Sequence, residues 1–249
     1  MQCFGLSQAT SLGKEFGVRK IGLIGGMSCE ATAVYYRRIN ELVRACLGGL
    51  HQAELLLYSV DFQKIVDMQK SGRWDDAGKY LAEIGHALEA AGADCTLICA
   101  VTMHLVAPAV EAAVTVPFIH VIDETAKHLK AADCKRPFLL ATRYTMEHGY
   151  YHERMKQHEI DVMVPDADGR TMVHNIIFEE LCTGKVLDRS RGVFISLIEK
   201  AKTEGADAVI FGCTELCLIL DADELPLPGF DSTAIHTEAA VRFALGELS

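Results

Sequence analysis

The hydrophobic positions of this chain form short apolar runs, each followed by a segment whose apolar residues recur at helical spacing. A short apolar run bounded by glycine or a polar turn is typical of a buried strand, and a period near 3.6 residues indicates an amphipathic helix. The expected strands are Lys20–Ile24, Ala53–Val60, Cys95–Ala100, Val116–Val121, Phe138–Ala141, Ile160–Val164, Ala208–Phe211 and a short one near Phe230.

Helices are expected between these strands, and residues before Arg19 are expected to form an unstructured lead. The first helix follows the turn Gly25-Gly26-Met27-Ser28, where the Ser28 side chain is suited to accept a hydrogen bond from the first helical N–H groups. The other expected helices are Trp74–Ala91, Pro108–Ala113, Thr125–Ala132, a segment through Tyr150 and Met155, Val173–Cys182, Ser190–Glu204 and Ala234–Leu245.

This alternation of strands and helices predicts an α/β fold in which two similar domains each contain a parallel β-sheet flanked by helices. Thr96–His104 and Ala208–Leu216 occupy matching places in the two halves. We expect a first domain over 19–118, completed by a C-terminal helix over 232–249, and a second over 119–231. Ligands bind outside the carboxyl ends of parallel strands, so both matching turns are expected at a cleft between the halves.

Charge and apolar run lengths exclude several classes of protein. The net charge is −10 and no dense block of Lys and Arg occurs, so a nucleic-acid surface is not expected. No apolar run approaches the roughly 18 residues of a membrane span, and the first residues do not resemble a secretory signal. A cytoplasmic protein without membrane contact is therefore expected.

The nine cysteines indicate neither a disulfide framework nor a metal site. Their number is odd, and a chain of 249 residues does not need covalent staples. No Cys-x-x-Cys pair occurs, and no histidine completes a zinc pattern. No metal is expected.

One cysteine occupies a position suited to chemistry. The apolar run Val209–Phe211 breaks at Gly212 onto Cys213. At the carboxyl end of a parallel strand, backbone N–H groups and the dipole of a following helix favour thiolate over thiol. The alternative is that Cys213 is a small apolar core residue.

Several motifs follow one another along nearly all of the chain after Arg19. They are IGLIGGMS with YYRRIN, GGLHQAELLLYSVDF, a TMH turn, ATRYTMEHGYYHERM, NIIFEEL, FGCTEL and FDSTAIHTEAAV. Together they resemble the aspartate/glutamate racemase family, in particular its broad-range amino-acid racemases. The resemblance implies a racemase without a cofactor, commonly a homodimer, with its active site in the interdomain cleft and an amino acid or related carboxylic acid as substrate.

The resemblance also implies a pair of acid/base residues. In that family two side chains, usually two cysteines or a threonine and a cysteine, face the substrate Cα from opposite sides. Two groups are needed because the proton removed and the proton returned lie on opposite faces of a planar carbanion. Cys213 matches the second acid/base, and Thr214 matches a residue that holds the α-carboxylate, although Thr214 is also suited to cap the next helix.

The first acid/base position departs from the family pattern. The matching residues are Ala100, which cannot carry a proton, and Val101, which lacks the family's amide; Thr102 is kept as an α-carboxylate contact. Cys99 is one position earlier, and strand alternation should turn it away from a cleft that Ala100 faces.

A second departure concerns the substrate side chain. Met172 stands where members with acidic substrates carry a lysine, so a neutral or apolar substrate becomes plausible, unless Arg143 or Arg170 compensates. Other positions that match the family's pocket are Met27, Gln69, Thr142 and Thr145, each with a structural role as its alternative. His104 and His120 are interpreted as structural.

Three functions follow from these residues. The first is an amino-acid racemase or epimerase in which Cys213 is one acid/base. The second is a single-cysteine decarboxylase or other one-base enzyme of the same superfamily, in which one thiol protonates a carbanion from one side. The third is a homologue that binds an amino or carboxylic acid without catalysis.

Overall fold

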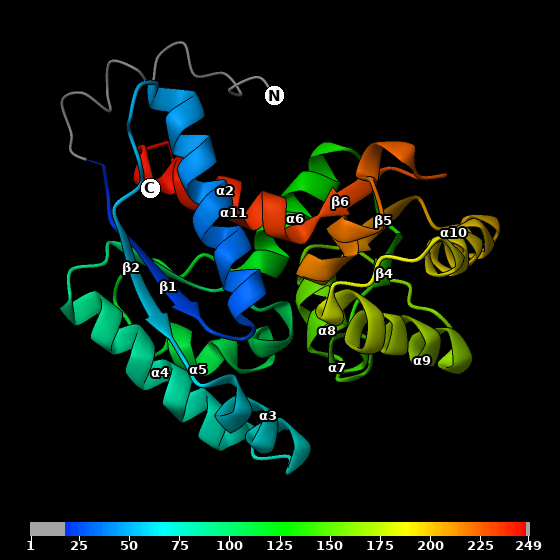
Figure 1. Ribbon diagram of the computed structural model, residues 1–249, viewed down its shortest axis with the longest axis horizontal. Helices are drawn as coiled ribbons and strands as arrows, with labels where there is room; N and C mark the ends of the chain where they lie inside the picture. Colours follow the sequence, from blue (N-terminus) through cyan, green and yellow to red (C-terminus); the bar gives the residue numbers. More distant parts are fainter. Residues whose placement is uncertain (1–17, 248–249) are drawn as a thin grey trace. The chain divides into compact units, whose positions relative to one another are not determined.

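The structure, a computed structural model, describes residues 18–247 and divides into two compact units (Figure 1). Unit 1 contains the residues up to His120 and those from His236 onward, and unit 2 runs from Val121 to Ile235. The lead expected before Arg19 falls almost entirely outside the described residues. Within residues 18–247, no helix has the length and apolar character needed to cross a membrane.

The sheet of unit 1 has the strand order β2-β1-β3, and all its strands are parallel. These strands are β1 (Ile21–Gly25), β2 (Leu55–Ser59) and β3 (Cys95–Ile98). Beyond β3, the expected strand Val116–Val121 is reduced to a single bridge between Thr96 and Phe118. Pro117 has no N–H to donate, and helix α6 (Val121–Ala131) already begins at Val121, so no longer ladder forms.

Two layers of helices cover this sheet. Ile21 and Leu23 of β1 pack in one core cluster with α2 (Cys29–Leu47) and the end of α11 (Ser232–Ala244). Ile24 belongs to a second cluster with α3 (Phe62–Lys70), α4 (Trp74–Ala90) and α5 (Ala107–Glu111). The alternation of side chains along β1 explains why neighbouring residues enter different clusters.

The start of α2 agrees with the sequence. Ser28 Oγ accepts a hydrogen bond from the backbone N–H of Ala31 at 3.3 Å, so the predicted N-cap is confirmed. The short helix α3 was not expected, because only Ile65 and Met68 in it are buried and its apolar pattern is brief. Asp61 caps α3 by accepting from the N–H of Gln63.

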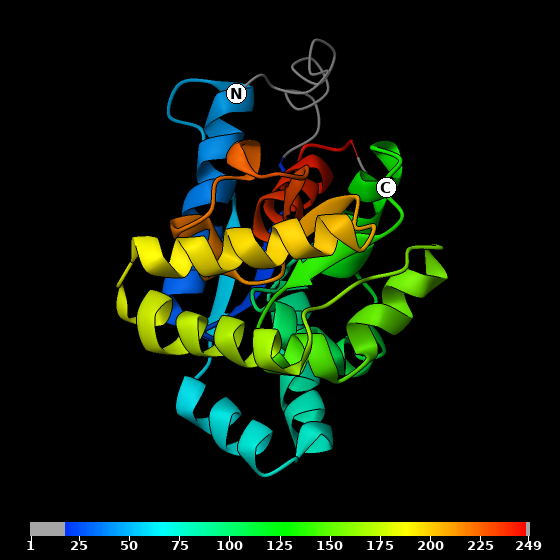
Figure 2. The ribbon, with the colours of Figure 1, turned by 90° about the vertical axis from the view of Figure 1, so that its right-hand side faces the viewer.

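The sheet of unit 2 has the strand order β4-β5-β6, and all its strands are again parallel. Its strands are β4 (Pro137–Leu140), β5 (Ala208–Phe211) and β6 (Gly229–Asp231), and the expected strand Ile160–Val164 is a single bridge between Phe138 and Met163. The remaining helices are α7 (Arg143–Glu147), α8 (Tyr150–Gln157), α9 (Ala167–Asn175) and α10 (Asp188–Thr203). Figure 2 shows α9 and α10 running alongside one another.

Two helices of unit 2 begin earlier than the sequence predicted. The carboxylate of Asp166 accepts from the N–H of Gly169 at 2.9 Å, so α9 starts at Ala167 rather than at Val173. Helix α6 starts at Val121 rather than Thr125, although Val121 and Ile122 favour strands; both are fully buried, and their packing overrides that preference.

The two units have similar backbone conformations at the turns that follow β3 and β5. Ala100 follows β3 and precedes the 3₁₀-helix Val101–Val106, with φ −151° and ψ 116°. Cys213 follows β5 and precedes the 3₁₀-helix Thr214–Leu218, with φ −150° and ψ 136°. The predicted α/β class, with parallel sheets flanked by helices in two similar halves, is confirmed.

Candidate active site

The position of Cys213 depends on the glycine before it. Gly212 donates its N–H to the carbonyl of Leu140 at 2.8 Å, which holds the end of β5 against the end of β4. A Cβ on Gly212 would lie 2.8 Å from Leu139 and 2.9 Å from Ala141. Only glycine therefore allows this close approach, which sets where the backbone of Cys213 leaves the sheet.

Glu215 connects the polar groups of this turn. The Cys213 thiol donates to Glu215 Oε2 at 2.9 Å, and the hydroxyl of Thr214 donates to the same oxygen at 2.6 Å. All three residues are partly exposed. One carboxylate oxygen thus holds both the thiol and the hydroxyl in fixed orientations.

The protonation of Cys213 differs from the expectation of a stabilised thiolate. Burial raises the pKa of the Cys213 thiol well above its usual value, and the negative charge of Glu215 and its hydrogen bond from the thiol raise it further. The helix that follows is a 3₁₀ segment of 5 residues, too short to supply a strong dipole. At neutral pH, Cys213 is therefore a thiol hydrogen-bonded to a carboxylate.

A chain of hydroxyls lies in the turn after β4. The hydroxyls of Thr142 and Thr145 are 3.3 Å apart, and the phenol of Tyr150 on α8 donates to Thr145 at 3.2 Å. Thr145 is fully buried, whereas Thr142 retains 9% exposure. Burial raises the pKa of Tyr150, so its phenol keeps the proton that it donates. The buried Thr145 thus orients the hydroxyl of Thr142 through a hydrogen bond.

The two arginines near Met172 differ in how their charges are paired. Arg170 donates to Glu147 at 2.9 Å and to the carbonyl of Pro165 at 2.9 Å, so its charge is already compensated. The guanidinium of Arg143 donates only a long 3.4 Å hydrogen bond to Thr171, next to Met172, and forms no ion pair with a described residue. Met172 itself is 43% exposed.

The equivalent turn of unit 1 carries no acid or base at its first position. Ala100 is partly exposed and offers only a methyl group, Val101 is buried, and Thr102 is partly exposed. His104 Nδ1 lies 3.0 Å from the carbonyl of Ala100, which can only accept, so Nδ1 carries the proton. The structural interpretation of His104 agrees with this bond, because it fixes the backbone of the turn.

Three other candidates of unit 1 lie in or against its core. Met27 is 6% exposed and packs among apolar side chains, which favours its structural alternative. The amide of Gln69 donates to the sulfur of Met103 at 3.1 Å. Cys99 is fully buried in the core cluster on the other face of the sheet from Ala100, as strand alternation predicted.

The sequence model of the family described as Asp/Glu/Hydantoin racemase matches residues 24–240. The chain belongs to this racemase family. It is similar to the broad specificity amino-acid racemase RacX of Bacillus subtilis (strain 168), with 21% identity over 224 residues, 89% of this chain and 96% of that protein.

Two solved structures are similar to this family member over most of its length. A protein from Yersinia pestis assigned as an Asp/Glu racemase has 45% identity and a TM-score of 0.87, covering 91% of this chain and 99% of that one. An aspartate racemase homologue from Pyrococcus horikoshii OT3 has 31% identity and a TM-score of 0.82, with coverage of 91% and 99%.

Two residues that contact the candidate site residues, Glu215 and Tyr150, were missed as candidates in the sequence. Glu215 stood inside the motif FGCTEL, and its spacing of two residues from Cys213 was a signal that a carboxylate could reach the thiol. Tyr150 gave no local signal, because its contact with Thr145 depends on how α8 packs against α7. Within unit 2 the structure brings Cys213 and Thr214 together through Glu215, and Thr142 and Thr145 together through their hydroxyls.

Proposed function

We propose that this protein is an amino-acid racemase that needs no cofactor and uses Cys213 to move the α-proton of its substrate. The observation that carries the proposal is the thiol of Cys213 bonded to Glu215 at the end of β5, in a chain of the racemase family. The name of RacX, a relative that acts on several amino acids, supports an amino acid as substrate.

Glu215 gives Cys213 a route to its reactive form. The carboxylate accepts the thiol proton, and the resulting thiolate takes the α-proton of the substrate from one face. Inversion then requires a second donor that delivers a proton to the opposite face, whereas return of the proton by Cys213 restores the starting enantiomer. The pair of Cys213 and Glu215 thus holds one proton between two groups, as coupled acids do. The backbone N–H of Thr214 and the hydroxyl of Thr142 are the proposed donors to the substrate carboxylate, whose negative charge grows as the carbanion forms.

The remaining substrate contacts are proposed according to exposure. Partly exposed side chains are suited to touch substrate, whereas buried ones shape the pocket from behind. The proposed contacts are the partly exposed Gln69, Ala100, Thr102 and Thr214, the exposed Met172, and Thr142, which is buried but keeps 9% exposure; the proposed supporting residues are the more deeply buried Met27, Val101 and Thr145.

A one-base reaction is the second candidate, and Ala100 is the observation that favours it. A methyl group at the position equivalent to Cys213 exchanges no proton, so the second acid/base must come from elsewhere or the enzyme delivers protons to one face only. A single-cysteine decarboxylase works in the latter way.

We also propose that the protein is cytoplasmic and that it forms a homodimer. Sedimentation of the purified protein would test the homodimer.

The reaction is tested by incubating L- and D-amino acids with the protein in D₂O and following Cα by NMR. Exchange of the α-proton together with inversion is expected for a racemase. Exchange without inversion would assign one-base chemistry, and saturable binding without exchange would assign a binding protein. Including neutral and acidic substrates also tests whether Met172 or Arg143 sets the side-chain preference.

A further inference from the structure

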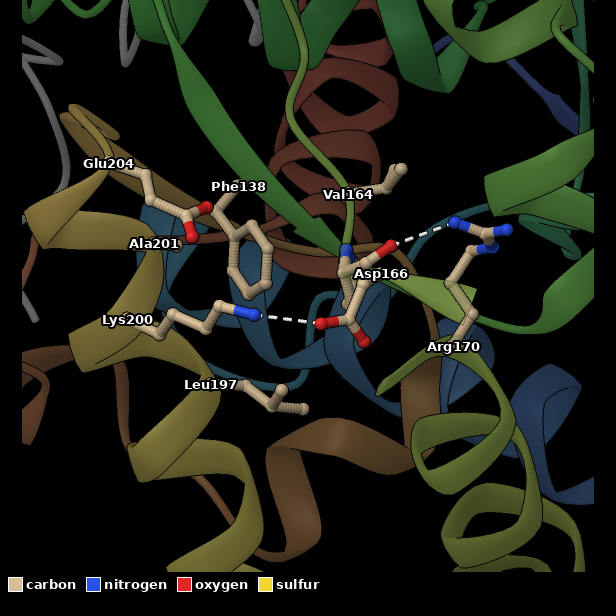
Figure 3. A pocket seen from close by; sticks show the side chains of 9 residues that line it. Phe138, Val164, Asp166, Arg170, Leu197, Lys200, Ala201 and Glu204 are labelled. Atoms are coloured by element: carbon tan, nitrogen blue, oxygen red, sulfur yellow. Dashed lines mark hydrogen bonds and ion pairs between the residues drawn. The ribbon is translucent and has the colours of Figure 1, made fainter. Parts of the chain in front are cut away.

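A pocket lies in unit 2, apart from the Cys213 turn. It has a volume of about 360 Å³ and is enclosed by β4, the start of α9 and the end of α10 (Figure 3). Phe138, Leu197 and Ala201 give it an apolar floor, and Phe138 and Ala201 are 3% and 2% exposed. Charged side chains surround this floor, so the pocket offers both apolar and ionic contacts.

The pocket is distinct from the proposed active site. Phe138 on its floor pairs with Val209 of β5, and Cys213 lies beyond the carboxyl end of that strand. An extended chain advances roughly 3.3 Å per residue, which places Cys213 about 13 Å further along than Val209. A small molecule in this pocket therefore does not occupy the Cys213 turn.

The charges of the pocket are unevenly satisfied. Lys200 binds Asp166 at 2.7 Å, a pair that spans the pocket in Figure 3. The carboxylate of Glu204 accepts no hydrogen bond from any residue between 18 and 247. Lys200 is on the last turn of α10 and Glu204 is the C-cap four residues further on, so they present opposite charges beside one another at the end of this helix.

We propose that this pocket binds a zwitterionic α-amino acid with an apolar side chain. The ligand's carboxylate binds Lys200, its ammonium binds Glu204, and its side chain lies on Phe138 and Leu197. A phosphate or dicarboxylate is disfavoured, because Asp166 and Glu204 would repel it and Arg170, the other cation of the lining, is already paired with Glu147. A simple amine would leave Lys200 without a new partner, and a simple carboxylate would leave Glu204 without one.

Leucine is the probe, and amide chemical shifts of the isotope-labelled full chain are the readout. Leucine is expected to shift the signals of Gly169, Leu197 and Ala201 in a saturable manner. Two truncated analogues, 4-methylpentanoate without the ammonium and 3-methylbutylamine without the carboxylate, are expected to bind about tenfold more weakly, since each lacks one charge-assisted contact. Glycine, which lacks the apolar side chain, should also bind weakly.

Substitutions in this pocket are expected to change the affinity for leucine in opposite directions. Lys200→Gln and Glu204→Gln are each expected to weaken leucine binding about tenfold. Asp166→Asn should strengthen it, because asparagine still caps α9 but no longer competes as an anion for Lys200. Lys202→Gln is the matched control, since Lys202 lies on the same helix, bonds to the carbonyl of Pro226 and does not line the pocket.

The proposal is overturned if leucine shifts only the signals around Gly212 and Thr214, or none. Equal binding of leucine and both analogues would also overturn it, as would weaker binding by Asp166→Asn. These binding measurements do not depend on turnover. Turnover is measured separately, by the exchange of the α-proton in D₂O.

Discussion

At the scale of single residues, Glu215 acts on Cys213 in two opposing ways. Its charge, together with burial, raises the pKa of the thiol and so disfavours the thiolate. Its oxygen, 2.9 Å from the sulfur, also offers the thiol proton a place to go. The first effect lowers general thiol reactivity, and the second supports a proton transfer that is coupled to substrate.

Glu215→Gln separates these effects. Without the charge, the pKa of Cys213 falls, so alkylation of Cys213 by iodoacetamide at pH 8 is expected to become faster. Loss of the proton acceptor is expected to slow Cα exchange about 100-fold or more. Mass spectrometry of the Cys213 peptide and NMR in D₂O measure the two rates. An unchanged exchange rate would show that Glu215 does not take part in proton transfer.

Ala100→Cys tests whether position 100 matters to inversion. A thiol there would occupy the backbone position equivalent to Cys213, so the variant is expected to raise the ratio of inversion to exchange. Chiral chromatography beside NMR exchange measures that ratio. Ala109→Cys, an exposed position on α5, is the control for a new surface thiol. An unchanged ratio of inversion to exchange in Ala100→Cys would mean that position 100 is not where the second acid/base is missing.

At the scale of elements, α8 supports the turn after β4. Tyr150 on α8 reaches Thr145 on α7, and Thr145 reaches Thr142 at the start of that helix. A hydroxyl chain of this kind fixes the proposed substrate contact Thr142 from behind. The turn has no side-chain cap of its own, because Thr142 makes no capping hydrogen bond to α7.

Tyr150→Phe removes one hydrogen bond from this chain. We expect a stability loss of about 1 kcal/mol, since Thr145 is buried and loses a donor. The KM is expected to rise several-fold with a smaller change in kcat, because Thr142 loses its fixed orientation. Tyr36→Phe, at a side chain that is 51% exposed, is the control. An equal change of KM and kcat, or none, would contradict this role.

The elements also show what the sequence could and could not predict. The buried strands β1, β3, β4 and β5 were found because their apolar runs end at glycine or polar turns. The short α3 was missed because its two buried residues give too brief a period. The helix expected behind Cys213 is a 3₁₀ segment, since the local pattern of apolar residues does not distinguish one turn of 3₁₀-helix from the start of an α-helix.

The candidate site was predicted unevenly for a physical reason. Cys213 could be located because a strand end and a motif coincide at one place in the chain. The roles of Thr145 and Tyr150 could not, because they depend on contacts between α7 and α8 that have no periodic signature. The raised pKa of Cys213 depends on burial and on the side chain of Glu215, both of which require the folded geometry.

At the scale of the whole molecule, two buried histidines, His104 and His236, couple stability to pH. His104 lies 4.7 Å from His120 and 5.7 Å from His236, measured between ring centroids. His236 Nε2 donates to the carbonyl of Ile119 at 2.8 Å, so its Nδ1 accepts from Tyr35 at 2.8 Å. Burial lowers the pKa of His236 to about 4 and lowers that of His104 well below its usual value.

This arrangement predicts loss of stability at acidic pH. An unfolded histidine binds a proton near pH 6.5 and the folded His236 only near pH 4, so stability is full above pH 6.5 and falls as the pH drops toward 4. The contribution of His236 is roughly 3 kcal/mol. Urea unfolding between pH 4.5 and 7 measures it, and His236→Gln should flatten the profile. A variant with the same pH slope as the wild type would contradict this account.

The most direct test of the central claim compares Cα exchange by the wild-type protein, Cys213→Ser and Cys217→Ser on the best substrate in D₂O. Both variants must first show the wild-type Tm, so that a loss of rate reports chemistry and not unfolding. We predict that Cys213→Ser loses exchange by at least about 100-fold, whereas Cys217→Ser, four positions further on, retains it. Equal exchange by the wild type and Cys213→Ser would show that another group moves the α-proton.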